Sequence, residues 1–206
     1  MLEMFKEEAK TKEEALEIIL NKTNLKQEDF FLKSEFIEGK LFKSSKYIVT
    51  ALKKDDVKKY IGDFIKNLST LLNIDIDSEV LFNGESYNVT LVSDNNSILI
   101  GKEGKTLNAI QTILRQAIKQ DASISLKINV DVGNYKLKKM RNIEKEVKII
   151  AKEVLTSKLE AKLDPMNSYE RRMVHNIINE YPNFETESFG EGKDRHVVIR
   201  YVEKAE

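Results

Sequence analysis

The chain has 206 residues, with 34 Lys and Arg against 34 Asp and Glu, so its formal net charge at pH 7 is zero. This length is enough for one large domain or for two to three small ones. The chain contains no cysteine, which excludes disulfides and thiolate metal sites. A charged start without an apolar signal core, and no stretch long enough to span a bilayer, predict a cytoplasmic protein.

The charges are unevenly distributed. Residues 134–172 carry eleven Lys and Arg against six Asp and Glu, whereas residues 56–133 carry eight against ten. A uniformly basic surface for long nucleic acid is therefore excluded, and any binding of phosphate must depend on a few local groups.

Residues 1–54 predict a small β-α-β-β domain. We expect strands at 3–9, 29–37 and 46–52, and a helix that begins after Thr11, because Thr11 and Glu14 have the spacing of a capping box. No chemical constellation occurs here, so a docking role is the default, and residues 53–56 are the expected linker.

Residues 55–133 predict the element order α-β-β-α-α-β. We expect a helix at 57–72 capped by Asp56, then strands at 76–82 and 85–93 joined by Asn83-Gly84, the strongest short hairpin signal. A helical turn at 97–100, a helix to about residue 120 and a strand at 124–132 follow. The apolar side of that last helix is Leu107, Ile110, Ile113, Leu114, Ala117 and Ile118.

The loop Gly101-Lys102-Glu103-Gly104 is the stretch around which this segment is organised. It is a helix-capping turn, a nucleotide-binding loop or the Gly-x-x-Gly loop of a KH domain. The Walker pattern would need a glycine at position 99, where this chain has Leu99. The surrounding element order favours the KH domain, whose loop clamps the backbone of about four nucleotides. The expected RNA-binding residues are Ile100, Gly101, Lys102, Glu103, Gly104 and Lys105, with unpaired backbone amides facing the sugar-phosphate strand.

Residues 134–206 predict a third domain that begins with a long helix at 135–158. Its apolar side is Ile143, Val147, Ile150, Ala151 and Leu155. Lys136, Lys138, Lys139 and Arg141 in its first turns form either a solvated face or auxiliary phosphate contacts, and both interpretations stay open.

A second helix at 169–178 begins after Asn167 or Ser168. Arg171 and His175 are four residues apart, so they share one face of that helix and can both face a phosphate, with Arg172 beside them. A hairpin at 184–190 and 195–202 brings Lys193 and Arg195 to its tip, where they could lie beside that face.

A family resemblance joins these observations. Asp164-Pro165-Met166-Asn167 followed by Glu170-Arg171-Arg172 and His175 resembles the Arg-x-x-x-His domain, which binds single-stranded nucleic acid. With a KH domain before it and a small β-α-β-β domain first, the chain is similar to the bacterial Jag family, also called KhpB or EloR. The junction Val130-Asp131-Val132-Gly133-Asn134-Tyr135 supports the same resemblance.

This resemblance implies an RNA-binding regulator linked to cell elongation, division and sporulation. It implies single-stranded RNA and a small single-KH protein as partners, and contact with membrane insertase machinery. Homodimerisation stays open.

The fold class expected is therefore α+β, with three small mixed domains in series at 1–54, 55–133 and 134–206. The leading hypothesis is a non-catalytic binder of single-stranded RNA, without metal, cofactor or catalytic residues. One alternative is a metal-independent ribonuclease that uses the two imidazoles of the chain, His175 and His196, as acid and base. The other is a scaffold that docks a protein through its N-terminal domain.

Overall fold

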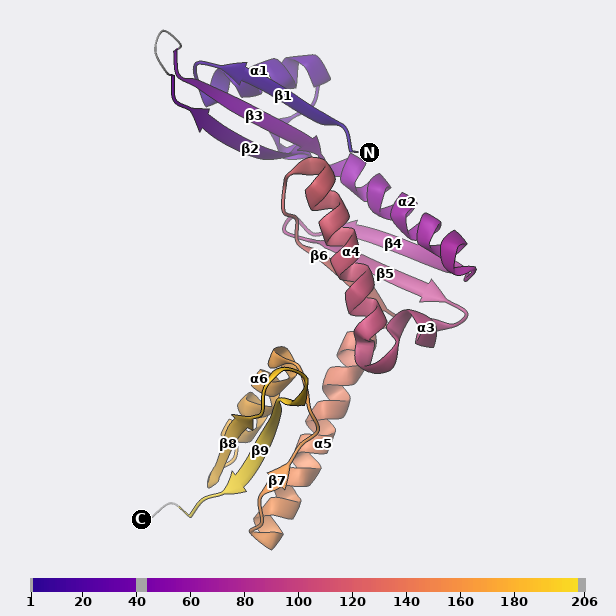
Figure 1. Cartoon of the computed structure of the whole chain (residues 1–206), viewed down its shortest axis with the longest axis vertical. Helices are drawn as coiled ribbons and strands as arrows, with labels where there is room; N and C mark the ends of the chain where they lie inside the picture. The colour runs from indigo at the N-terminus through magenta and orange to yellow at the C-terminus, as the bar shows by residue number, and fades with distance from the viewer. Residues whose placement is uncertain (1, 40–43, 204–206) are drawn as a thin grey trace. The chain divides into compact units, whose positions relative to one another are not determined.

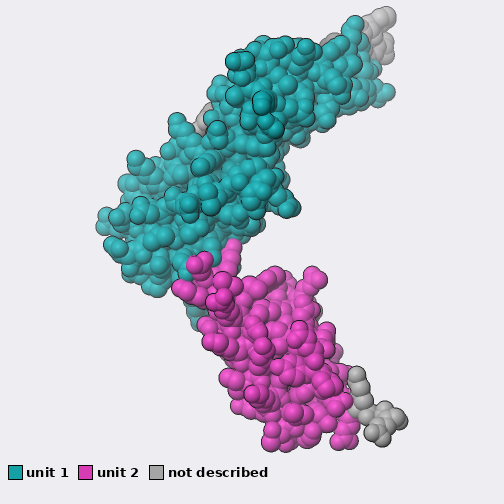
Figure 2. All heavy atoms as spheres, turned by 180° about the vertical axis from the view of Figure 1, so that it is seen from behind, with its two compact units in different colours: residues 1–133 teal, residues 134–206 magenta. Residues whose placement is uncertain are grey.

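The computed structural model describes residues 2–39 and 44–203 (Figure 1). Over these ranges the chain forms three separate three-stranded sheets, each accompanied by helices. The chain divides into two compact units, residues 1–133 and residues 134–206, which Figure 2 colours separately. The α+β fold class is confirmed.

The first sheet lies in unit 1 and has the strand order β1-β3-β2, with both pairs antiparallel. Helix α1 packs on one face of it, and Ala15, Ile19, Phe30, Val49 and Ala51 form the buried core. The capping box of Thr11 and Glu14 is present, and the β-α-β-β order is confirmed. The elements are β1 (Met4–Ala9), α1 (Lys12–Thr23), the 3₁₀ turn η1 (Gln27–Asp29), β2 (Phe30–Ile37) and β3 (Lys46–Lys53).

The linker expected at 53–56 is wrong. Strand β3 ends at Lys53 and helix α2 (Lys54–Leu72) begins at the next residue. Lys53 takes the N-cap position, so Asp56 lies in the first turn and does not cap the helix. The chain therefore passes from one sheet to the helix of the next with no connecting loop.

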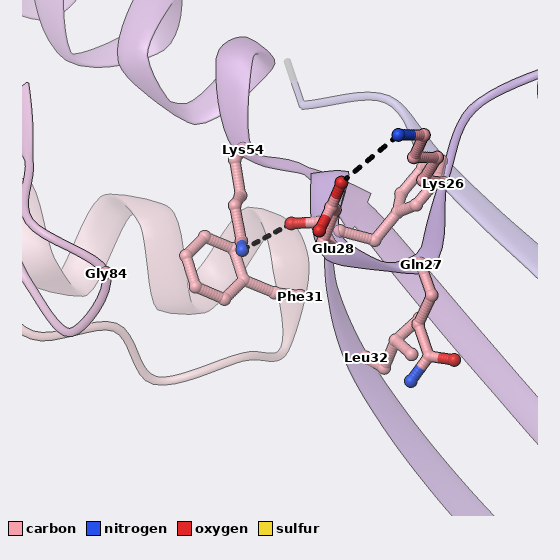
Figure 3. A pocket seen from close by; sticks show the side chains of 8 residues that line it. Lys26, Gln27, Glu28, Phe31, Leu32, Lys54 and Gly84 are labelled. Carbon is pink, nitrogen blue, oxygen red and sulfur yellow. Dashed lines mark hydrogen bonds and ion pairs between the residues drawn. The ribbon is translucent and has the colours of Figure 1, made fainter.

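Packing around Lys54 explains why no linker exists. Its ammonium group lies 5.5 Å from the centre of the Phe31 ring and 5.3 Å from that of Phe82, and it donates to the backbone carbonyl of Glu28. The hydroxyl of Tyr87 donates to the backbone carbonyl of Lys54 over 2.8 Å. Figure 3 shows this lysine in a pocket of the surface that is also lined by Lys26, Gln27, Glu28, Phe30, Phe31, Leu32 and Gly84. These contacts join the two sheets of unit 1.

The second sheet has the strand order β4-β5-β6, in which β5 is antiparallel to β4 and parallel to β6. Helix α2 packs against β4 and helix α4 against β6 (Figure 1). The predicted order α-β-β-α-α-β is confirmed. The elements after α2 are β4 (Ile76–Phe82), β5 (Tyr87–Ser93), α3 (Asn96–Ile100), η2 (Lys102–Gly104), α4 (Lys105–Ala122) and β6 (Ile128–Val132).

Three details of this segment differ from expectation. The hairpin loop spans 83–86, because the side-chain oxygen of Asn83 accepts the amides of Glu85 and Ser86 and so replaces a two-residue turn. Strand β6 begins at Ile128, since only residues from there on pair with β5. Ile113 is 58% exposed, because it lies one residue outside the stripe of α4 that faces the sheet.

Unit 2 is built on a third sheet, with the antiparallel order β7-β9-β8. Helices α5 and α6 contribute Val147, Ala151, Val154, Val174 and Ile178 to a core shared with β9. Leu155, expected on the apolar side of α5, is exposed, and Val154 is buried in its place. The elements are α5 (Tyr135–Ser157), the unpredicted β7 (Ala161–Lys162), α6 (Ser168–Asn179), β8 (Phe184–Phe189), η3 (Gly192–Asp194) and β9 (His196–Tyr201).

Candidate nucleic-acid interface

The Gly-x-x-Gly loop is a sharp turn between α3 and α4 that requires its first glycine. Gly101 has φ +67° and ψ −179°, a backbone conformation open almost only to glycine. A Cβ added to Gly101 would lie 2.2 Å from Oγ1 of Thr106 in the first turn of α4. Gly104 has φ +83°, also a left-handed conformation that favours glycine. The loop therefore folds back closely over the start of α4.

The side chains at the tip of this loop are exposed, but several of its backbone amides are occupied. Lys102 and Glu103 are exposed, Ile100 is half-buried and Gly104 is buried. The amide of Gly101 donates to the carbonyl of Ser97 over 2.8 Å, that of Gly104 to the carbonyl of Gly101 over 3.2 Å, and that of Lys105 to the carbonyl of Lys102. The expectation that the loop offers unpaired amides is wrong for these three positions, because the short helical turns use them. Phosphate contact at the loop then depends on its side chains.

Glu103 reduces the positive charge of this tip. Its carboxylate lies 3.3 Å from the ammonium group of Lys105. Glu103 also adopts φ +57°, which is uncommon for a residue with a side chain. Among the described residues, Lys102 makes no ion pair and is therefore the strongest candidate cation of the loop.

A capping box fixes the start of α6. The side-chain oxygen of Asn167 accepts the amides of Tyr169 and Glu170, each over 3.0 Å, and the carboxylate of Glu170 accepts the amide of Asn167. The other oxygen of this carboxylate lies 2.5 Å from Nζ of Lys139 on α5. This network joins the two helices of unit 2.

Lys139 is thus placed differently from the auxiliary phosphate contact expected. Partial burial acts to lower the pKa of Lys139, but the hydrogen bond and charge of Glu170, with Tyr135, outweigh it and the pKa is raised. Its charge is committed to Glu170, which is buried. Lys138 and Arg141 are exposed on α5, and Lys136 is half-buried.

His175 is oriented by strand β8. Its Nδ1 lies 2.6 Å from the hydroxyl of Thr186 and its Nε2 lies 3.0 Å from the hydroxyl of Ser188. Burial, together with the positive charge of nearby Arg171, lowers the pKa of His175, so the ring is neutral at pH 7. One ring nitrogen then donates and the other accepts, and both are used within the fold.

Arg171 and Arg172 supply the charge of this helix face. Arg171 is half-buried, and its Nε is buried with no hydrogen-bond partner within residues 2–39 and 44–203. Arg172 is exposed. Lys193 in η3 and Arg195 after it are exposed as well, and the carbonyl of Arg195 accepts the amide of Met166, just before α6.

The second histidine is also held inside the fold. His196 is buried, and its Nδ1 lies 2.8 Å from the carbonyl of Asp194, so this nitrogen carries the proton. Neither imidazole is placed as a free acid or base, and nothing in this geometry favours the ribonuclease alternative. In the described part of the chain, no group of three or more His, Asp and Glu side chains is suited to hold a metal ion.

Comparison with known proteins identifies the family. Residues 54–132 match the family described as KhpA/KhpB, KH domain, and residues 141–201 match the family of the Arg-x-x-x-His domain. The RNA-binding protein KhpB of Clostridium symbiosum is 31% identical over 154 residues, which are 74% of this chain and 69% of the relative. The chain belongs to the KhpB family.

Further KhpB proteins are similar to the chain at lower identity. That of Bacillus subtilis is 28% identical over 163 residues, 78% of this chain and 78% of the relative. That of Lactiplantibacillus plantarum is 26% identical over 140 residues, 68% of this chain and 42% of the relative. The resemblance to the Jag and KhpB family is confirmed.

Three residues that position the KhpB motifs were missed at the level of sequence. Thr186 and Ser188 orient His175, and Glu170 joins α6 to α5. The spacing of Asn167 and Glu170 is that of a capping box and indicated Glu170. The two hydroxyls alternate along β8, so they share one face, but nothing in their pattern points to a particular histidine.

Across the described ranges, none of the helices combines the length and the hydrophobicity needed to cross a bilayer.

Proposed function

We propose that this protein is a non-catalytic regulator that binds single-stranded RNA. The observation that carries the proposal is that one chain matches both the KhpA/KhpB KH domain and the Arg-x-x-x-His domain, and that its relatives are named RNA-binding proteins. The exposed cations at the tip of the KH loop and at the start of α6 support it.

The two surfaces would divide the work. On the KH loop, Lys102 and Lys105 hold phosphate while unpaired bases are splayed beside the helices and read at their edges. On unit 2, Arg171, Arg172, Lys193 and Arg195 hold the backbone, and Lys138 and Arg141 extend the same charge along α5. Each surface carries few charges, so each binds weakly alone, and their presence on one chain raises the affinity of the whole.

The wider setting follows from the family resemblance. We infer three domains at 1–54, 55–133 and 134–206, a cytoplasmic location, and a role in cell elongation, division and sporulation. A small single-KH protein is the inferred protein partner, with contact to a membrane insertase and homodimerisation as further inferences.

A titration with fluorescent single-stranded RNA tests the proposal. Replacing Lys102 and Glu103 with Asp should weaken binding and lower the dependence on salt by about 0.7 in the slope of log K against log salt, as expected for one lost phosphate contact. Arg171→Ala should give a separate, smaller loss. Lys66→Asp, an exposed lysine on α2, is the matched control. Absence of RNA binding by the unaltered protein would refute the function, and equal affinities of all variants would refute these surfaces.

A further inference from the structure

Tyr169 is an aromatic residue that no feature of the fold requires to be on the surface. It is 62% exposed, although it lies in the first turn of α6, where its amide is fixed by the side chain of Asn167. Its hydroxyl lies 3.7 Å from the sulfur of Met140 on α5. The ring therefore starts from a rigid backbone position and reaches from one helix to the other.

The neighbours of Tyr169 form a small apolar surface. On α6, Met173 lies one turn further along the same side and is half-buried. On α5, Leu137 lies one turn before Met140 and is 48% exposed. We call Leu137, Met140, Tyr169 and Met173 the Tyr169 platform.

Cations lie beside this platform. Arg172 is exposed and lies three residues after Tyr169, on the same side of α6. On α5, Lys136 lies four residues before Met140. The one carboxylate of the first turn of α6, that of Glu170, is already paired with Lys139. The surface next to the aromatic ring is therefore apolar with a positive border.

We propose that the Tyr169 platform stacks against an unpaired base of single-stranded RNA while Arg172 binds a neighbouring phosphate. This inference rests on the proposed function and adds to it a base contact on unit 2, for which only backbone contacts were expected. Exposed aromatic rings next to cations are how single-stranded nucleic acids are bound without strong sequence preference. Four side chains are also too few for a stable protein interface, which takes about 20–30 residues on each side.

The chain contains no tryptophan, which gives a direct probe of stacking. Tyr169→Trp introduces a single indole at the platform, and Ile149→Trp introduces one at a position on α5 that is 58% exposed and outside the platform. Titration with a 12-nucleotide oligouridine should quench the emission of the first variant, with the same midpoint as binding measured by anisotropy. The emission of the second should change little. Binding without quenching at position 169 would overturn the inference.

Affinity gives an independent readout. Tyr169→Ala should weaken binding roughly 5-fold to 150-fold, the range typical of one lost stacking contact. Tyr169→Phe keeps the ring and loses only the hydroxyl, so its affinity should stay within about 2-fold of the unaltered protein. If the unaltered protein binds and Tyr169→Ala binds equally well, the platform fails and the RNA-binding function stands. If the unaltered protein does not bind RNA, both fail.

Discussion

Replacing Gly101 with alanine should destabilise unit 1 strongly, for two separable reasons. The backbone of Gly101, at φ +67° and ψ −179°, is strained for any residue with a side chain, which costs about 1–3 kcal/mol. The added Cβ would also lie 2.2 Å from Oγ1 and 2.8 Å from Cβ of Thr106, and relieving such overlap costs a further ~1–3 kcal/mol. The free energy of unfolding should therefore fall by roughly 2–6 kcal/mol.

Two other glycines of unit 1 separate these contributions. Gly84 has φ +92° but nothing within 4 Å of an added Cβ, so Gly84→Ala should cost only the backbone strain, about 1–2 kcal/mol. Gly62 lies inside α2, with nothing within 4 Å of an added Cβ and no positive φ. Gly62→Ala should therefore stabilise the protein by about 0.5–1 kcal/mol.

Urea unfolding followed by far-ultraviolet circular dichroism measures all three variants. The predicted order of stability is Gly62→Ala above the unaltered protein, then Gly84→Ala, then Gly101→Ala. A Gly101→Ala variant within about 0.5 kcal/mol of the unaltered protein would refute the close crossing of the loop over Thr106. Equal losses for Gly84→Ala and Gly101→Ala would show that only the backbone conformation matters.

Three further predictions concern charged groups. Glu103→Gln should raise RNA affinity about 2-fold to 5-fold and steepen the salt dependence, because Lys105 loses its carboxylate partner; unchanged slopes in a salt titration would contradict this. Lys139→Met should lower the free energy of unfolding by about 1 kcal/mol, allowing for partial exposure of the pair, whereas Lys148→Met, which breaks an exposed pair with Glu144, should have a smaller effect in the same urea experiment. The pKa of His175 is lowered from its ordinary value of 6.5 by burial and by Arg171, so the unfolded chain takes up its proton first as the pH falls. Stability should thus be lost below about pH 6.5, and a His175→Asn variant whose melting temperature falls equally between pH 7.5 and 5.5 would argue against that cause.

Local rules were sufficient for most of the fold. The helix spacing of apolar residues and the alternation along strands predicted the order of elements in both units, and the capping box at Thr11 and Glu14 placed the start of α1 within a residue. Gly101 and Gly104 marked the loop, because no other residue type adopts such turns readily. Such signals depend only on residues a few positions apart in the chain.

Contacts between distant residues decided what these rules could not. Lys53 to Asp56 have the composition of a linker, but the packing of Lys54 against Phe31 and Phe82 makes them a continuous strand and helix.

The candidate site shows the same division. The sequence places Arg171 and His175 on one face, and only the fold shows that Thr186 and Ser188 hold the imidazole neutral and inward. Lys139 resembles its neighbours on α5 in sequence, and its pairing with Glu170, 31 residues away, removes it from them. A side chain's charge and hydrogen-bonding capacity are set by its residue type, whereas the partner that uses them is set by tertiary packing.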